Sequence, residues 1–251
     1  MDRNFCETVF EEVTALKIKD AGGMIRRCRT PCRQRLQRKL DRHAESMVNL
    51  AKNSFSEMLI QANTLDSNDF KCWIFWPGML FNSLDKWWGD HGRRDFPHEG
   101  IDLCLYEDRS GRLVRLDEKI RIPAMDDGVV RAIFTDYLGQ AVIIEHETAQ
   151  SGNGRYVSVY AHTKPREGLR SGVIVKEGEI IATIADTRRS KAKILPHLHF
   201  SLGRPSPDLV YENFVWNIMR DPDRVALMDP LEAIKGPWRV LAPEDRYCRE
   251  C

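Results

Sequence analysis

The feature that most constrains the fold is a series of short β-rich segments between residues 100 and 202. Glycine-containing turns separate these segments, and no long helical pattern intervenes, which argues against alternating βαβ units. We therefore predict a mainly β domain built as an antiparallel β-sheet sandwich or barrel-like fold. The strands are expected at 100–105, 128–134, 141–146, 156–162, 172–175, 179–184 and 197–202.

The first 70 residues have a helical pattern instead. Apolar residues recur at three-to-four spacing from Phe5 to Leu16, and Gly22-Gly23 ends that helix. A second helix begins near Thr30-Pro31, and its apolar stripe continues to Ala62. We predict a helical N-terminal segment (1–70), a β-rich domain (71–240) and a C-terminal tail (241–251), with a short helix between Val210 and Met228.

The polar face of the second predicted helix is basic where the helix begins. Two interpretations stay open. The face could lie on an anionic membrane or cell-wall polymer, or the apolar stripe could pack on the neighbouring domain while the charges stay in water. The packing interpretation is favoured. The basic residues are Arg26, Arg27, Arg29, Arg33, Arg35, Arg38, Lys39 and Arg42.

Composition excludes several other classes. The formal net charge is +1, so no global field selects nucleic acid as a partner. No apolar run is long enough to predict a transmembrane helix, and the N-terminus lacks the pattern of a signal peptide. The seven cysteines are an odd number and do not form a secreted disulfide framework.

Histidines occur where they could act together. His197 and His199 are two residues apart on a predicted strand, so both rings project from one face while Leu198 and Phe200 point to the core. Two imidazoles on one face can supply a metal ligand and a proton-transfer group. Taken alone, a pair of this kind is more often a surface feature.

Two further segments add polar groups. His98 and Asp102 flank Gly100 where a loop enters a strand, and imidazole nitrogen and carboxylate oxygen are both zinc ligands. His162 ends the strand 156–162, where regular alternation puts it on the same face as Tyr160. Each segment alone is weak support for a site.

The order of these motifs changes their weight. His98-x-Gly-x-Asp102, a strand ending Tyr160-Ala-His162, and Pro196-His-Leu-His-Phe200 together resemble the M23 (LytM/lysostaphin-type) metallopeptidases. Intervening features that match include Gly92-x-Arg94, Asp127-Gly128 and the Gly139-x-x-Val pattern before His146. The resemblance covers about residues 72–235.

The resemblance implies roles for five residues. His98, Asp102 and His199 would bind one zinc ion, which leaves one coordination position for water. His162 and His197 would be catalytic: one would take a proton from that water and the other would stabilise the oxyanion, with the assignment open. The implied activity is hydrolysis of peptide bonds in peptidoglycan cross-bridges, and the implied location is the cell envelope or periplasm.

Some features depart from the resemblance or carry no role in it. The basic stretch from Arg188 to Pro196 replaces the glycines that family members often have, and Pro205 to Met228 resembles an insertion. His146 is expected to be structural. Four tryptophans before His98 could line a groove, although core packing is favoured, and these are Trp73, Trp76, Trp87 and Trp88.

Two alternative functions remain. A non-enzymatic binding or regulatory relative could share the fold, although such relatives typically lose metal ligands that this chain retains. A biotinyl or lipoyl carrier domain is suggested only by the turn at Lys176-Glu177-Gly178. The carrier interpretation gives no reason for the histidines and ranks lowest.

Overall fold

The structure is a computed structural model that describes residues 54–67, 69–147, 154–187, 194–232 and 234–242. The chain divides into two compact units, Met1–Met47 and Val48–Cys251, and every described residue lies in the second. The helices predicted before residue 54 therefore lie outside the described residues. No described helix is long and apolar enough to cross a membrane.

The larger of two sheets carries most of the predicted strands. Its main path runs in the order β12-β11-β8-β7-β6-β9, while β2 pairs with β11, and β10 pairs with both β5 and β8. All of these pairs are antiparallel. The strands are β2 (Ile101–Leu103), β5 (Arg121–Pro123), β6 (Gly128–Thr135), β7 (Gln140–Glu147), β8 (Arg155–Pro165), β9 (Ile174–Val175), β10 (Ile180–Ile184), β11 (Leu198–Pro205) and β12 (Val225–Met228).

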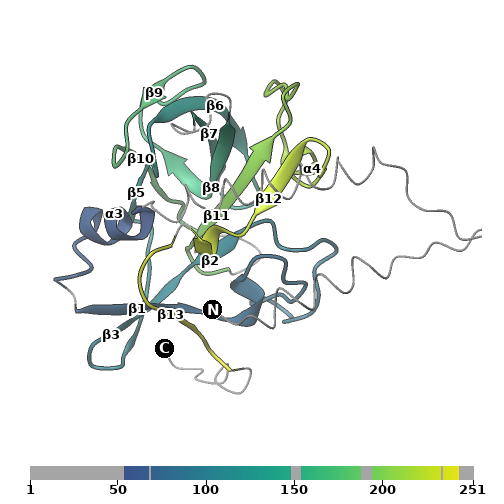
Figure 1. The fold of residues 1–251 in the computed structure, drawn as a ribbon. Helices are drawn as coiled ribbons and strands as arrows, with labels where there is room; N and C mark the ends of the chain where they lie inside the picture. The colour runs from purple at the N-terminus through teal and green to yellow at the C-terminus, as the bar shows by residue number, and fades with distance from the viewer. Residues whose placement is uncertain (1–53, 68, 148–153, 188–193, 233, 243–251) are drawn as a thin grey trace, which may run out of the picture. The chain divides into compact units, whose positions relative to one another are not determined.

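A smaller sheet lies beside the larger one, below it in Figure 1. Its order is β13-β1-β3-β4, and β1 and β13 pair in parallel, in contrast to the other pairs. Strands β1, β4 and β13 of this sheet were not predicted from the sequence. The strands are β1 (Phe70–Phe75), β3 (Leu105–Asp108), β4 (Leu113–Arg115) and β13 (Trp238–Val240). A short 3-10 turn at Pro77–Met79 follows β1, and another at Pro230–Glu232 follows β12 of the larger sheet.

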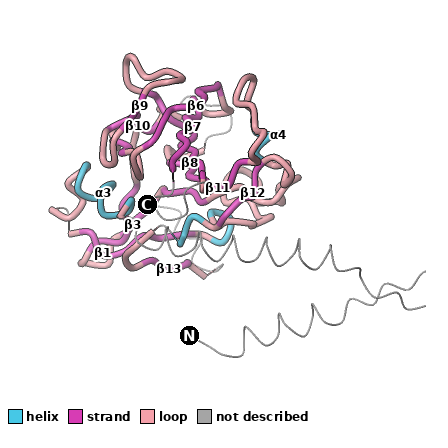
Figure 2. Tube along the Cα trace, turned by 45° about the horizontal axis from the view of Figure 1, so that its top comes forward, coloured by secondary structure: helices cyan, strands magenta, loops and turns pink. Residues whose placement is uncertain are grey.

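Helix α3 (Phe55–Ala62) is part of the main apolar core. The Phe55 ring stacks on Phe200 of β11 at a centroid distance of 4.4 Å and meets Tyr160 of β8 edge-on at 5.9 Å. At the next residue of the helix, Ser56 accepts the indole N–H of Trp73 of β1 at 2.7 Å. Figures 1 and 2 show α3 beside β10 and the smaller sheet, so its side chains join both sheets.

The opposite face of the larger sheet is covered by the segment between β11 and β12. Phe214 and Met219 from this segment are buried against Ile143 and Val159 of the sheet. The segment contains α4 (Trp216–Met219), which confirms the short helix expected between Val210 and Met228. With both faces covered, β7 and β8 are buried along most of their length, and β7 carries the continuous apolar run Ala141–Ile144.

The predicted mainly β fold is confirmed, and each of the seven predicted strands corresponds to a strand or strand pair. The segment 100–105 is divided between β2 and β3, because Cys104 interrupts the pairing. Helix α3 confirms the end of the second predicted helix. The division of the chain at residues 70 and 240 stays a prediction, and α3 packs in one core with the strands that follow it.

We predict that Phe55→Ala lowers the free energy of unfolding by about 3–5 kcal/mol, because it empties a fully buried aromatic site. Urea unfolding followed by tryptophan fluorescence measures this change. Ile174→Ala is the control, since Ile174 is 69% exposed and its truncation should change stability by no more than about 0.5 kcal/mol. Equal stabilities of the two variants would contradict a core role for α3.

Candidate metal centre and active site

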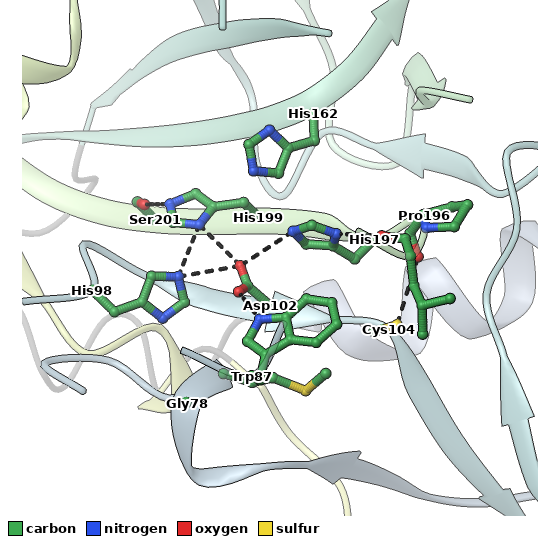
Figure 3. A network of polar contacts seen from close by, with 12 residues as sticks. Gly78, Trp87, His98, Asp102, Cys104, His162, Pro196, His197, His199 and Ser201 are labelled. Carbon is green, nitrogen blue, oxygen red and sulfur yellow. Dashed lines mark hydrogen bonds and ion pairs between the residues drawn. The ribbon is translucent and has the colours of Figure 1, made fainter. Parts of the chain in front are cut away.

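A pocket lies where β2, β8 and β11 come together, and four of the five predicted site residues line it, namely Asp102, His162, His197 and His199. The fifth, His98, is buried beside Asp102 and His199. Figure 3 shows the four imidazole rings arranged around the Asp102 carboxylate. The structure thus brings together residues that are up to 101 positions apart in the chain.

The register of β2 against β11 places two of these groups opposite each other. Asp102 pairs directly with His199, and its neighbour Ile101 pairs with Phe200 on the core side. Gly100 makes this close approach possible, because a Cβ atom there would lie 2.2 Å from the Phe200 carbonyl oxygen. A side chain at residue 100 would push β2 away from β11 and separate Asp102 from His199.

Three donor atoms converge on one point. His98 Nε2 lies 3.0 Å from His199 Nδ1 and 3.2 Å from Asp102 Oδ1, and the last two atoms are 3.0 Å apart. Zinc bonds of about 2.0–2.2 Å in tetrahedral geometry separate ligand atoms by about 3.3–3.6 Å. The observed triangle is slightly smaller, so a small outward movement of the side chains would seat the ion. Among the described histidine, cysteine, aspartate and glutamate residues, the three that lie close enough together to hold a metal ion are His98, Asp102 and His199.

Outer hydrogen bonds direct these atoms toward the shared point. His98 donates Nδ1–H to the Leu80 carbonyl at 3.0 Å, because a carbonyl only accepts, and its Nε2 therefore carries a lone pair. Ser201 Oγ lies 2.9 Å from His199 Nε2 and can accept its proton, which leaves Nδ1 for the metal. The His98 lone pair and the Asp102 carboxylate are both acceptors at close range, and a cation between them satisfies both.

The other oxygen of Asp102 is held from the opposite side. Trp87 donates its indole N–H to Asp102 Oδ2 at 2.6 Å, and the Arg94 guanidinium lies 3.7 Å from the same oxygen. Burial of Asp102 would raise its pKa, but the nearby His98 and His197 lower the pKa well below the usual value. The carboxylate is therefore ionised and oriented, as a metal ligand must be.

His197 lies next to this triad without joining it. Its Nδ1–H donates to the Leu195 carbonyl at 2.7 Å, so Nε2 points inward, 3.7 Å from Asp102 Oδ1. Burial lowers the pKa of His197 to about 3, which makes the ring neutral at pH 7. A neutral imidazole with a lone pair at Nε2 can accept a proton or, once protonated, donate one.

His162 completes the set from the neighbouring strand, and its ring centroid lies 4.8 Å from that of His197. The expectation that His162 shares a face with Tyr160 is wrong. Tyr160 packs with Phe200 in the core, whereas His162 faces the pocket. The pairing of β7 with β8 is irregular between Gln140 and Val142, and this irregularity reverses the alternation.

The segment after β11 forms one wall of the pocket. Trp216 of α4 meets the His199 ring edge-on at a centroid distance of 5.2 Å. Arg220, just beyond α4, forms an ion pair with Glu99, which lies between His98 and Gly100 in the chain. The insertion predicted at Pro205 to Met228 therefore shapes the site, a contribution that the sequence motifs did not indicate.

Other predicted features have separate outcomes. His146 is buried away from the site, where it hydrogen-bonds to the Asp127 carbonyl and to Ser158, and this confirms its structural role. Trp73 and Trp87 are buried in the core, as favoured, and Trp88 lines the pocket. Within the basic stretch before His197, residues 188–193 lie outside the described residues.

Comparison with known proteins supports the resemblance. The sequence model described as Peptidase family M23 matches residues 98–208, a range that contains all five site residues. This part of the chain is similar to the M23 peptidase domain. The comparison with curated proteins gave no match.

Similar solved structures cover part of the chain. A zinc-containing peptidase from Vibrio cholerae is 24% identical, with a TM-score of 0.34, over 53% of this chain and 37% of that one. The solution structure of lysostaphin is 21% identical (TM-score 0.32) over 56% of this chain and 49% of that one. A putative glycyl-glycine endopeptidase from Ruminococcus gnavus is 18% identical (TM-score 0.36) over 70% and 65%. This chain thus spans less than half of the first two.

We predict that Trp87→Phe weakens zinc binding by about 10–100-fold, because it removes the hydrogen bond that orients the Asp102 carboxylate. Competition with a fluorescent chelator measures the affinity. Trp73→Phe is the matched control, since Trp73 is a buried tryptophan whose N–H bonds to Ser56 instead. Equal zinc affinities of the two variants would show that the Trp87 contact does not support the site.

Proposed function

We propose that the M23 domain is a zinc metalloendopeptidase that cuts peptide bonds in peptidoglycan cross-bridges. The observation that carries this proposal is the convergence of His98 Nε2, Asp102 Oδ1 and His199 Nδ1 within 3.0–3.2 Å beside an open pocket. Three protein ligands leave a coordination position for water or substrate, which is the arrangement of catalytic rather than structural zinc.

The proposed division of labour follows from the outer contacts. His98, Asp102 and His199 would hold the ion, since their donor atoms face one another. A bound zinc ion would polarise the scissile carbonyl and lower the pKa of a water molecule to about 7. His162 and His197 line the same pocket with inward-facing lone pairs, so one can take the proton of the water and pass it to the leaving amine. The other can hydrogen-bond the oxyanion once its inward nitrogen has taken up a proton and become a donor.

The pocket walls are consistent with an extended peptide substrate. Trp88 and Trp216 give apolar surface on two sides, and the exposed Tyr137 stands at the rim in the turn between β6 and β7. Peptidoglycan as the source of the peptide rests on the family resemblance of the sequence motifs. The chain also offers Arg94 and Arg220 in the pocket, each already paired with a carboxylate.

We predict that the purified chain holds about one zinc ion and clears a suspension of purified peptidoglycan, and that His199→Ala abolishes both properties. Metal analysis and turbidity measure these outcomes, and mass spectrometry of the products identifies the bond that is cut. His91→Ala is the control, because His91 is exposed and lies outside the triad. Full wall-cutting activity in His199→Ala would overturn the proposal. Stoichiometric zinc without hydrolysis in the wild type would instead favour the non-enzymatic alternative.

A second prediction separates the two histidine sets. His162→Ala should keep its zinc, because His162 is not part of the converging triad, but should lose on the order of 10²–10⁴-fold in kcat. Metal content and peptide hydrolysis are measured on the same sample. Loss of zinc together with activity would place His162 among the ligands and contradict the proposed division.

A further inference from the structure

His162 reaches the pocket through an irregularity in strand β8. The register passes from Gln140↔Thr163 to Val142↔Tyr160, so Ala161 and His162 together oppose the single residue Ala141. This is a β-bulge, and it turns the following side chain to the other face of the sheet. With regular alternation, the His162 ring would lie on the Tyr160 side, in the core.

The bulge requires an unfavourable backbone conformation. His162 has a φ of +60°, in the left-handed region that residues with a Cβ atom adopt infrequently. A residue held in this conformation beside a functional pocket needs contacts that select it over the extended alternative. The contacts of His162 therefore show what holds its ring in place.

Asp136, at the turn between β6 and β7, makes two of these contacts. Its Oδ2 accepts a hydrogen bond from the His162 backbone N–H at 2.7 Å and faces His162 Nδ1 at 3.1 Å. Its Oδ1 accepts from the backbone N–H groups of Leu138 and Gly139, at 2.8 and 2.6 Å. The Asp136 side chain is fully buried, and the hydrogen bonds within its own turn fix the orientation of the carboxylate that faces His162.

The same contacts define which ring nitrogen of His162 carries the proton. Burial would raise the pKa of Asp136, but the hydrogen bonds from His162 and from the turn N–H groups lower it to about 2. An ionised carboxylate only accepts, so His162 Nδ1 must carry a hydrogen. The lone pair is then at Nε2, and Figure 3 shows one ring nitrogen of His162 directed toward His197 and His199.

We propose that Asp136 is the positioning residue for His162: it holds the bulge that turns the ring into the pocket and fixes the tautomer with its lone pair at Nε2. The catalytic consequence rests on the proposed function, in which His162 handles a proton. The structural consequence does not depend on that function.

Asn at position 136 tests both parts. The two turn N–H groups need an acceptor, so the amide oxygen would face Leu138 and Gly139 and the amide NH₂ would face His162. The backbone N–H of His162 would then lose its acceptor, which weakens the hold on the bulge. Nδ1 of His162 would then have to accept, which moves its proton to Nε2. The wrong tautomer cannot take a proton from water at Nε2.

The experiment records long-range ¹⁵N–¹H NMR spectra of the full chain with ¹⁵N-labelled histidine, in the zinc-loaded and zinc-free protein. The His162 resonances are those lost in His162→Ala. We expect the Nδ1–H form in the wild type and the Nε2–H form, or a mixture, in Asp136→Asn. Asp117→Asn is the matched control, because Asp117 also accepts a backbone N–H two residues ahead in a turn, that of Lys119 at 2.9 Å. It should leave the His162 tautomer unchanged.

Kinetics on the same samples add the catalytic part. Asp136→Asn should lose on the order of 10²–10⁴-fold in kcat with KM and zinc content unchanged, since ground-state binding is not altered. Thermal melting checks that the variant is folded. If it is not, Asp136→Ser takes its place, because serine can still cap the turn but is too short to reach His162.

Two results would overturn the proposal: an Nε2–H tautomer in the wild type, or an unchanged tautomer in a folded Asp136 variant. Failure of the proposed function has a different pattern. In that case no peptide is hydrolysed by the wild type, while the tautomer still changes between the wild type and Asp136→Asn.

Discussion

The pairing of β2 with β11 is the constraint on which the rest of the site depends. It sets Asp102 directly opposite His199, and Gly100 allows the two backbones to approach closely enough for their side chains to meet. His98 then needs only the short distance across Gly100 to reach the same point. A displacement of one residue in this register would turn Asp102 toward the core. The geometry of the candidate metal centre is therefore a property of the backbone pairing as well as of the three converging side chains.

Both faces of the larger sheet are buried, and each burial serves the site in a different way. On one face, Phe55 of α3 stacks on Phe200 and fixes the core side of β11. On the other face, the segment between β11 and β12 packs on β7 and β8 and sets Trp216 against His199. Strand β11 is thus packed between two apolar layers. This packing restricts the His197 and His199 rings to orientations that face the pocket.

The sequence predicted the parts of this arrangement that follow from regular geometry. Two-residue alternation placed His197 and His199 on one face, and the spacing around Gly100 indicated that His98 and Asp102 could meet. The position of His162 could not be predicted in this way, because a bulge depends on pairing with β7 and on Asp136, 26 residues earlier in the chain. The hydrogen bonds that Trp87 and Leu80 make to the site were not predicted, for a related reason. Their contacts with the site depend on how the loop between β1 and β2 folds, and no periodic pattern encodes that path.

The ion pair between Arg220 and Glu99 has a consequence for how the cleft can diversify. Glu99 is adjacent to His98 in the chain. The ion pair therefore connects the wall that carries Trp216 to the segment before β2, which supplies the donor atoms of His98 and Asp102. Arg220 also lies over the Phe96 ring, which ties it to the same stretch of backbone. Under the proposed function, remodelling this wall to accept a different peptide would therefore also shift the candidate metal ligands His98 and Asp102. The turn at Tyr137 borders the pocket from the other side, and its Asp136 holds His162, so only the 75% exposed Tyr137 side chain can change there without disturbing a site residue.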